Sequence, residues 1–131
     1  MAGARSIGGG TGVDGTEYDG FGADAIRFTL ATMATEGQDL RLWPERFETG
    51  RNFANKVWNA GRFTLMSVGD DPIKPLAEVK DDLELSDRWI LSRLSWTAES
   101  LTQELEKFRL HDVADKAYHF FWGELADWYL E

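Results

Sequence analysis

Cysteine is absent from this chain of 131 residues. A disulfide scaffold and a cysteine zinc site are therefore both excluded. No apolar run approaches the roughly 20 residues that a membrane-spanning helix needs, and no basic segment followed by an apolar run opens the sequence. We therefore predict neither a membrane span nor a secretory signal, and we expect a cytoplasmic protein.

Positive charge is also scarce. The chain has 14 Lys and Arg against 23 Asp and Glu, a formal net charge of −9. General nucleic-acid coats usually carry an excess of cations, so the balance argues against such a coat and we predict no DNA partner. Residues 41–62 differ from the rest, because they hold five cations and two glutamates and thus a charge of +3. A basic strip on an acidic body permits local phosphate contact and disfavours indiscriminate binding.

Catalytic patterns are lacking as well. The only two histidines, His111 and His119, are eight residues apart, and no cluster of acids completes a metal site. The serines have no His–Asp partners at a recognisable spacing. The neighbouring Asp81 and Asp82 are typical of a solvated acidic connection. From these residues we predict no catalytic residue, metal site or cofactor.

Glycine is concentrated at the start, where residues 1–22 contain eight of the 13 glycines. Such a segment loses much conformational entropy on ordering and offers little apolar surface in return. We therefore predict a flexible Gly-rich leader over residues 1–21. A phosphate-binding loop is the alternative, but no strand is predicted before the glycines and no Gly-Lys-Ser/Thr follows them.

Apolar residues recur at helical spacing in four later segments. These segments are Asp24 to about Glu36, Pro44 to Val68, Ser86 to about Phe108, and His111–Asp112 to the end. Gly37 and Gly69 are natural helix stops, and Ser86 suits the N-cap of the third helix. The prediction is an all-α fold, a helical bundle. The last segment has a wide apolar arc, so we also expect an exposed apolar end through which chains could self-associate.

Residues 51–63, RNFANKVWNAGRF, form the most informative stretch. On a helix, one side of this stretch is apolar and includes Trp58, which we predict to be in the core. The opposite side offers cations, amides and an aromatic ring, which suit RNA phosphates, base edges and stacking. The candidate RNA-binding residues are Arg51, Asn52, Asn55, Lys56, Asn59, Arg62 and Phe63. A merely solvated polar surface is the alternative, because exposed helix faces are commonly polar.

Four blocks of sequence resemble one family in the right order over about 110 residues. They are GADAIRFTLATMATEGQDLRL (22–42), RNFANKVWNAGRF (51–63), SDRWILSRL (86–94) and HFFWGELADWYLE (119–131). This pattern resembles valyl-tRNA synthetase, a class I aminoacyl-tRNA synthetase. The resemblance implies a fragment that runs from just after the KMSKS loop into the anticodon-binding domain. Residues 22–43 would be the linker helix that joins the catalytic and anticodon-binding regions, and residues 44–131 a partial helical anticodon-binding domain.

The resemblance also implies a partner, which is tRNA bound near its anticodon. The full-length family is a ligase of protein biosynthesis that uses ATP and Mg²⁺ to attach valine to its tRNA. No lysine precedes Lys56 here, so the loop lysines that contact ATP phosphates in the family have no counterpart. We therefore expect this chain alone to be inactive as an enzyme. The alternative function is a non-catalytic helical protein–protein interaction module derived from a synthetase.

Overall fold

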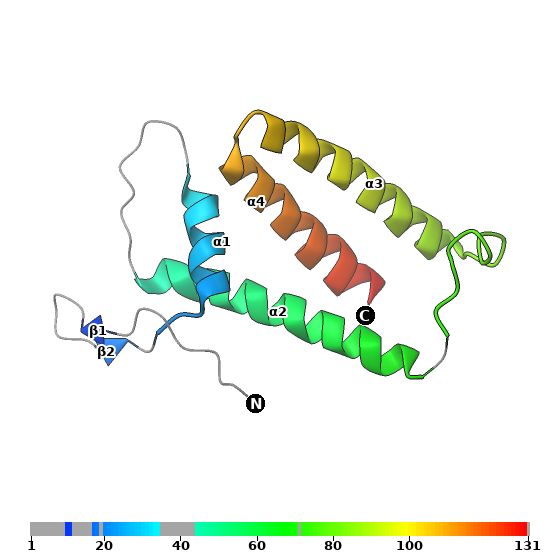
Figure 1. The fold of residues 1–131 in the computed structure, drawn as a ribbon, viewed down its shortest axis with the longest axis horizontal. Helices are drawn as coiled ribbons and strands as arrows, with labels where there is room; N and C mark the ends of the chain where they lie inside the picture. Colours follow the sequence, from blue (N-terminus) through cyan, green and yellow to red (C-terminus); the bar gives the residue numbers. More distant parts are fainter. Residues whose placement is uncertain (1–9, 12–16, 19, 35–43, 71, 131) are drawn as a thin grey trace.

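The computed structural model describes residues 10–11, 17–18, 20–34, 44–70 and 72–130 (Figure 1). Within these ranges the chain is mainly helical, which confirms the predicted all-α bundle. The helices are α1 (Ala23–Met33), α2 (Pro44–Val68), α3 (Leu85–Glu106), α4 (Leu110–His119) and the wider π-helix η1 (Phe120–Tyr129). The strands β1 (Gly10–Thr11) and β2 (Glu17–Tyr18) form a two-residue antiparallel pairing. None of the described helices is long and apolar enough to cross a membrane.

Helix α2 has the predicted bounds. Pro44 occupies its first position, where a missing backbone N–H costs nothing. Gly69 follows its last residue with φ +60°, the left-handed conformation that favours glycine at a helix end. Helix α1 ends at Met33 with Ala34 as its C-cap, and residues 35–36 of the predicted helix lie outside the described residues.

The predicted start of α3 is wrong, because Glu84 is the N-cap in place of Ser86. The Glu84 side chain accepts from the N3 backbone, while the Asp87 carboxylate accepts from the Glu84 backbone N–H at 2.8 Å. This reciprocal capping box satisfies two backbone donors at once. The other end of α3 also comes earlier than predicted, at Glu106, and Phe108 turns the chain toward α4 with φ 58°.

The last predicted helix changes character midway. Its first part, α4, is an ordinary α-helix, but from Phe120 the turns widen into η1. The Leu130 N–H donates to the Leu125 carbonyl at 2.9 Å, five residues back. Within η1, the Glu124 carboxylate pairs with Arg93 of α3 and the Asp127 carboxylate pairs with Lys56 of α2.

The helices pack around an aromatic cluster. Helix α1 crosses α2 at Gly50, where an added Cβ would lie 2.4 Å from the Thr29 hydroxyl oxygen. One turn later, Phe53 is buried among three rings, with centroid distances of 4.4 Å to Phe28, 5.1 Å to Tyr118 and 5.8 Å to Phe121. Figure 1 shows α3 antiparallel to α4, with α4 and η1 lying between α3 and α2. The core is therefore formed where α1, α2 and the α4–η1 helix meet.

The end of the predicted flexible leader is packed against the bundle. Phe21 is buried, and its ring centroid lies 5.4 Å from that of Phe47 on α2. Residues 1–9, 12–16 and 19 of the leader lie outside the described residues. The leader's bounds therefore stay a prediction, whereas Phe21 belongs structurally with α2.

Candidate nucleic-acid interface

The seven predicted RNA-binding residues all lie on α2, but the structure gives two of the cations other partners. Lys56 Nζ forms a salt bridge with Asp127 of η1 and lies 4.0 Å from the centroid of the Trp122 ring. Its charge is thus neutralised within the bundle, and its side chain links α2 to η1. Lys56 is therefore poorly placed to contact a phosphate.

Arg51 is also engaged within the chain. Its guanidinium lies 3.6 Å from the Glu48 carboxylate and 5.4 Å from the centroid of the Phe21 ring. These contacts compensate part of its charge and place it beside the buried end of the leader.

The other five predicted residues are exposed along α2: Asn52, Asn55, Asn59, Arg62 and Phe63. Phe63 keeps 57% of its surface accessible, which leaves an aromatic ring open to solvent. Within the described part of the chain, no carboxylate pairs with Arg62. These residues remain candidates for RNA contact, and Arg62 is the cation among them whose charge is uncompensated.

Trp58 is not in the core, so that prediction is wrong. Its side chain is 72% exposed. Helix α1 crosses α2 two turns earlier, at Gly50, and Lys56 contacts η1 from a different side of the helix. No described helix therefore covers the indole. Helical periodicity put Trp58 on the same side as apolar residues, but that side extends beyond the surface that α1 covers.

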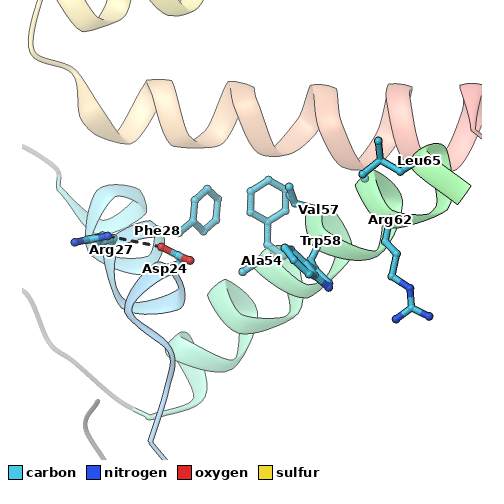
Figure 2. Close-up of a pocket in the computed structure, with 10 residues that line it drawn as sticks. Asp24, Arg27, Phe28, Ala54, Val57, Trp58, Arg62 and Leu65 are labelled. Carbon is cyan, nitrogen blue, oxygen red and sulfur yellow. Dashed lines mark ion pairs between the residues drawn. The ribbon is translucent and has the colours of Figure 1, made fainter. Parts of the chain in front are cut away.

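Trp58 instead lines a groove of about 790 Å³ between α1 and α2 (Figure 2). The lining residues are Asp24, Arg27, Phe28, Phe53, Ala54, Val57, Trp58, Gly61, Arg62 and Leu65. Most of them are apolar, and the charged ones are two arginines and one aspartate. Asp24 lies 3.7 Å from Arg27 on the α1 side, so the groove has a formal charge of +1 that is centred on Arg62. Sequence reasoning missed this groove because it depends on how α1 crosses α2.

A second polar cluster joins α3 to η1. Arg93 donates two hydrogen bonds to Glu124, at 2.6 and 2.7 Å, and its guanidinium lies 4.8 Å from the Trp96 ring centroid. The hydrogen bonds from Arg93 lower the pKa of Glu124, and they raise the pKa of Arg93. The Arg93 guanidinium and the Glu124 carboxylate thus compensate each other's charge.

Polar contacts join both ends of α3 to the last helix, through Glu104 near the α3–α4 corner and through Asp87 at the start of α3. Glu104 is buried and accepts a hydrogen bond from Lys116 Nζ at 3.0 Å, which lowers the pKa of its carboxyl group despite desolvation. Tyr129 donates to Asp87 at 2.7 Å, which lowers the pKa of Asp87 and raises that of Tyr129. These polar groups therefore have a structural role, because their contacts hold α3 to the last helix.

His111 has a structural contact between two helices. Its Nδ1 contacts the Thr32 carbonyl oxygen and so joins α4 to α1. His119 lies 3.4 Å from Asp115 within α4. Over the residues described, no group of three or more metal-ligating side chains comes together.

Comparison with known proteins places these helices in a family. Residues 87–131, which include most of α3 together with α4 and η1, match the anticodon-binding domain of tRNA ligase. The matched region begins after α2 and therefore contains none of the seven predicted RNA-binding residues.

Valine–tRNA ligases are similar to nearly the whole chain. Over 123 residues, which are 93% of this chain, it is 46% identical to the enzyme of Fervidobacterium nodosum and 44% identical to that of Clostridium tetani. The enzyme of Staphylococcus saprophyticus is 42% identical over the same length. The matched segment spans only 14% of each of these relatives. The chain therefore corresponds to a segment of valine–tRNA ligases, and this segment includes part of the anticodon-binding domain.

Proposed function

We propose that this chain binds tRNA in the anticodon region, as part of a ligase that attaches valine to its tRNA. The observation that carries the proposal is the match of residues 87–131 to the anticodon-binding domain of tRNA ligase. In the longer protein, ATP and Mg²⁺ would serve the catalytic region, and this segment would supply part of the grip on tRNA. A cytoplasmic location fits this role in protein biosynthesis.

The exposed side of α2 extends this RNA surface. Arg62 supplies an uncompensated positive charge, and Asn55 and Asn59 expose amides that can pair with base edges. Phe63 adds an exposed ring on which a base can stack. Arg51 and Lys56 contribute less to RNA binding in this proposal, because Glu48 and Asp127 already balance their charges.

Replacing Arg62 with alanine should weaken tRNA binding and its salt dependence. Each phosphate contact contributes roughly 0.7–0.9 to the slope of log affinity against log salt, so the slope should become shallower by about that amount. Lys56→Ala is the matched control and should change the slope less, because Asp127 neutralises Lys56. The measurement is fluorescence anisotropy of labelled valine tRNA at several salt concentrations. A wild-type chain that shows no salt-dependent tRNA binding would refute the proposed function.

We also propose self-association through an apolar end of the bundle. Leu85 at the start of α3 is 84% exposed, and Trp128 near the end of η1 is 76% exposed. Met66 in the last turn of α2 is 71% exposed, and Figure 1 shows these three helix ends on the same side of the molecule. Exposed apolar surface of this kind drives association.

Sedimentation velocity tests this self-association. Over a roughly hundredfold range of protein concentration, we expect a dimer or larger species to form at the high end. High salt should not dissociate this dimer or larger species, because salt does not screen apolar contacts. A strictly monomeric profile throughout would show that the exposed end does not associate.

A further inference from the structure

We propose that the groove between α1 and α2 binds an unpaired RNA base, with Trp58 as the stacking surface and Arg62 as the phosphate contact. This inference rests on the proposed tRNA binding and assigns it a specific site. The groove brings together an exposed indole and an arginine one helical turn apart (Figure 2). Stacking on an aromatic ring beside a cation is a common way in which proteins hold single-stranded nucleic acid.

The first argument comes from the other aromatic–cation pairs of the molecule. Three such pairs have a carboxylate that neutralises the cation. They are Arg51 over Phe21 with Glu48, Lys56 over Trp122 with Asp127, and Arg93 over Trp96 with Glu124. Arg62 and Trp58 differ, because among the described residues no acid pairs with Arg62 and the indole is largely exposed. Arg62 thus retains its charge, and Trp58 its ring surface, for a ligand in the groove that both side chains line.

The second argument is the shape and chemistry of the groove. Its volume of about 790 Å³ lies within the roughly 300–1,000 Å³ of typical ligand sites. Phe28, Val57 and Leu65 give it apolar walls that suit the faces of a base. The Asp24–Arg27 pair on α1 offers an acceptor and donors that suit a base edge. The site can therefore hold a planar polar-edged ring more completely than an isolated surface tryptophan could.

The third argument is charge. The groove has a formal charge of +1, whereas the whole chain has a net charge of −9. An anionic ligand is therefore attracted to the groove more than to the chain as a whole. A purely apolar protein segment would leave Arg62 without a counter-charge, whereas a nucleotide brings the base and the phosphate together. The observations therefore favour RNA over a protein segment.

The experiment compares variants of the full chain for binding to a labelled valine-tRNA anticodon stem–loop. Trp58→Ala should weaken binding about 5- to 150-fold, the range that corresponds to the 1–3 kcal/mol typical of one stacked base. The salt slope should stay close to the wild-type value, because stacking releases few counterions. Ile73→Ala is the control for loss of exposed apolar surface: Ile73 is 82% exposed, and it lies outside both the groove lining and residues 87–131. It should bind like the wild type.

A second variant tests the groove without removing the indole. An added Cβ at Gly61 would meet nothing within 4 Å, so Gly61→Leu can enter the helix and fill the groove beside Trp58. It should weaken stem–loop binding as Trp58→Ala does. Thermal unfolding of each variant, followed by circular dichroism, confirms that the fold is kept. A fully paired RNA duplex is the control ligand, and neither variant should change its affinity.

The possible failures are distinguishable. If the wild type binds the stem–loop while Trp58→Ala and Gly61→Leu bind it equally well, the groove assignment is wrong and tRNA binding stands. If the two variants lose self-association in sedimentation but keep RNA affinity, the groove is a protein-docking surface and the assignment is again wrong. If the wild type binds no tRNA in a salt-dependent way, the proposed function and the groove assignment fail together.

Discussion

Replacing Phe53 with alanine is expected to lower the free energy of unfolding by about 3–5 kcal/mol. Phe53 is buried and its ring meets Phe28 of α1, Tyr118 of α4 and Phe121 of η1. The substitution therefore leaves a cavity at the point where three elements join α2, and it removes aromatic pairs as well as apolar burial. Urea denaturation followed by circular dichroism measures the change.

Phe63→Ala is the matched control, because Phe63 lies on the same helix but is 57% exposed. It should change stability by no more than about 0.5 kcal/mol, as for most surface substitutions. If Phe53→Ala fails to fold, Phe53→Leu supplies a smaller truncation whose loss can still be measured. A Phe53→Ala protein as stable as the Phe63→Ala protein would contradict the aromatic core described here.

Replacing Gly50 with alanine is expected to destabilise the fold by about 1–3 kcal/mol. A Cβ at Gly50 would lie 2.4 Å from the Thr29 hydroxyl oxygen and 2.6 Å from the Ala25 carbonyl oxygen. The hydroxyl can rotate, but the carbonyl belongs to the α1 backbone, so the two helices must separate. This separation should outweigh the roughly 1 kcal/mol that alanine gains over glycine in a helix interior.

Gly61→Ala provides the opposite expectation on the same helix. A Cβ there meets nothing within 4 Å, so the helix-propensity gain of about 1 kcal/mol should appear as added stability. The two alanine variants should thus shift the thermal midpoint in opposite directions. Equal shifts for both would show that α1 does not approach α2 closely at Gly50.

Local signals in the sequence predicted the helices well, since their bounds depend on nearby residues. Pro44 and Gly69 fixed α2, because their effects on the backbone require no distant partner. The predicted start of α3 is wrong because Ser86 is taken as the cap, whereas the reciprocal capping box of Glu84 and Asp87 places the N-cap two residues earlier. The widening of the last helix into η1 has no counterpart in the apolar spacing of the sequence.

The candidate site was predicted only in part, for a different physical reason. Helical periodicity shows which residues share a side of α2, but it does not show what covers that side. Lys56 is predicted to face RNA, but its ammonium group forms a salt bridge with Asp127, which lies 71 residues later in the chain. Helical periodicity predicts Trp58 in the core, yet Trp58 is 72% exposed, because no described helix covers it.

The Lys56–Asp127 link also bears on the entropy of the unfolded chain. It closes a loop of 71 residues, whereas the Glu104–Lys116 contact at the α3–α4 corner closes one of 12. Because closure entropy grows with the logarithm of loop length, the longer loop costs about 1.6 kcal/mol more to close. The Glu104–Lys116 contact between α3 and α4 therefore forms at the lower cost in chain entropy. The Lys56–Asp127 contact between α2 and η1 requires the greater loss of chain entropy.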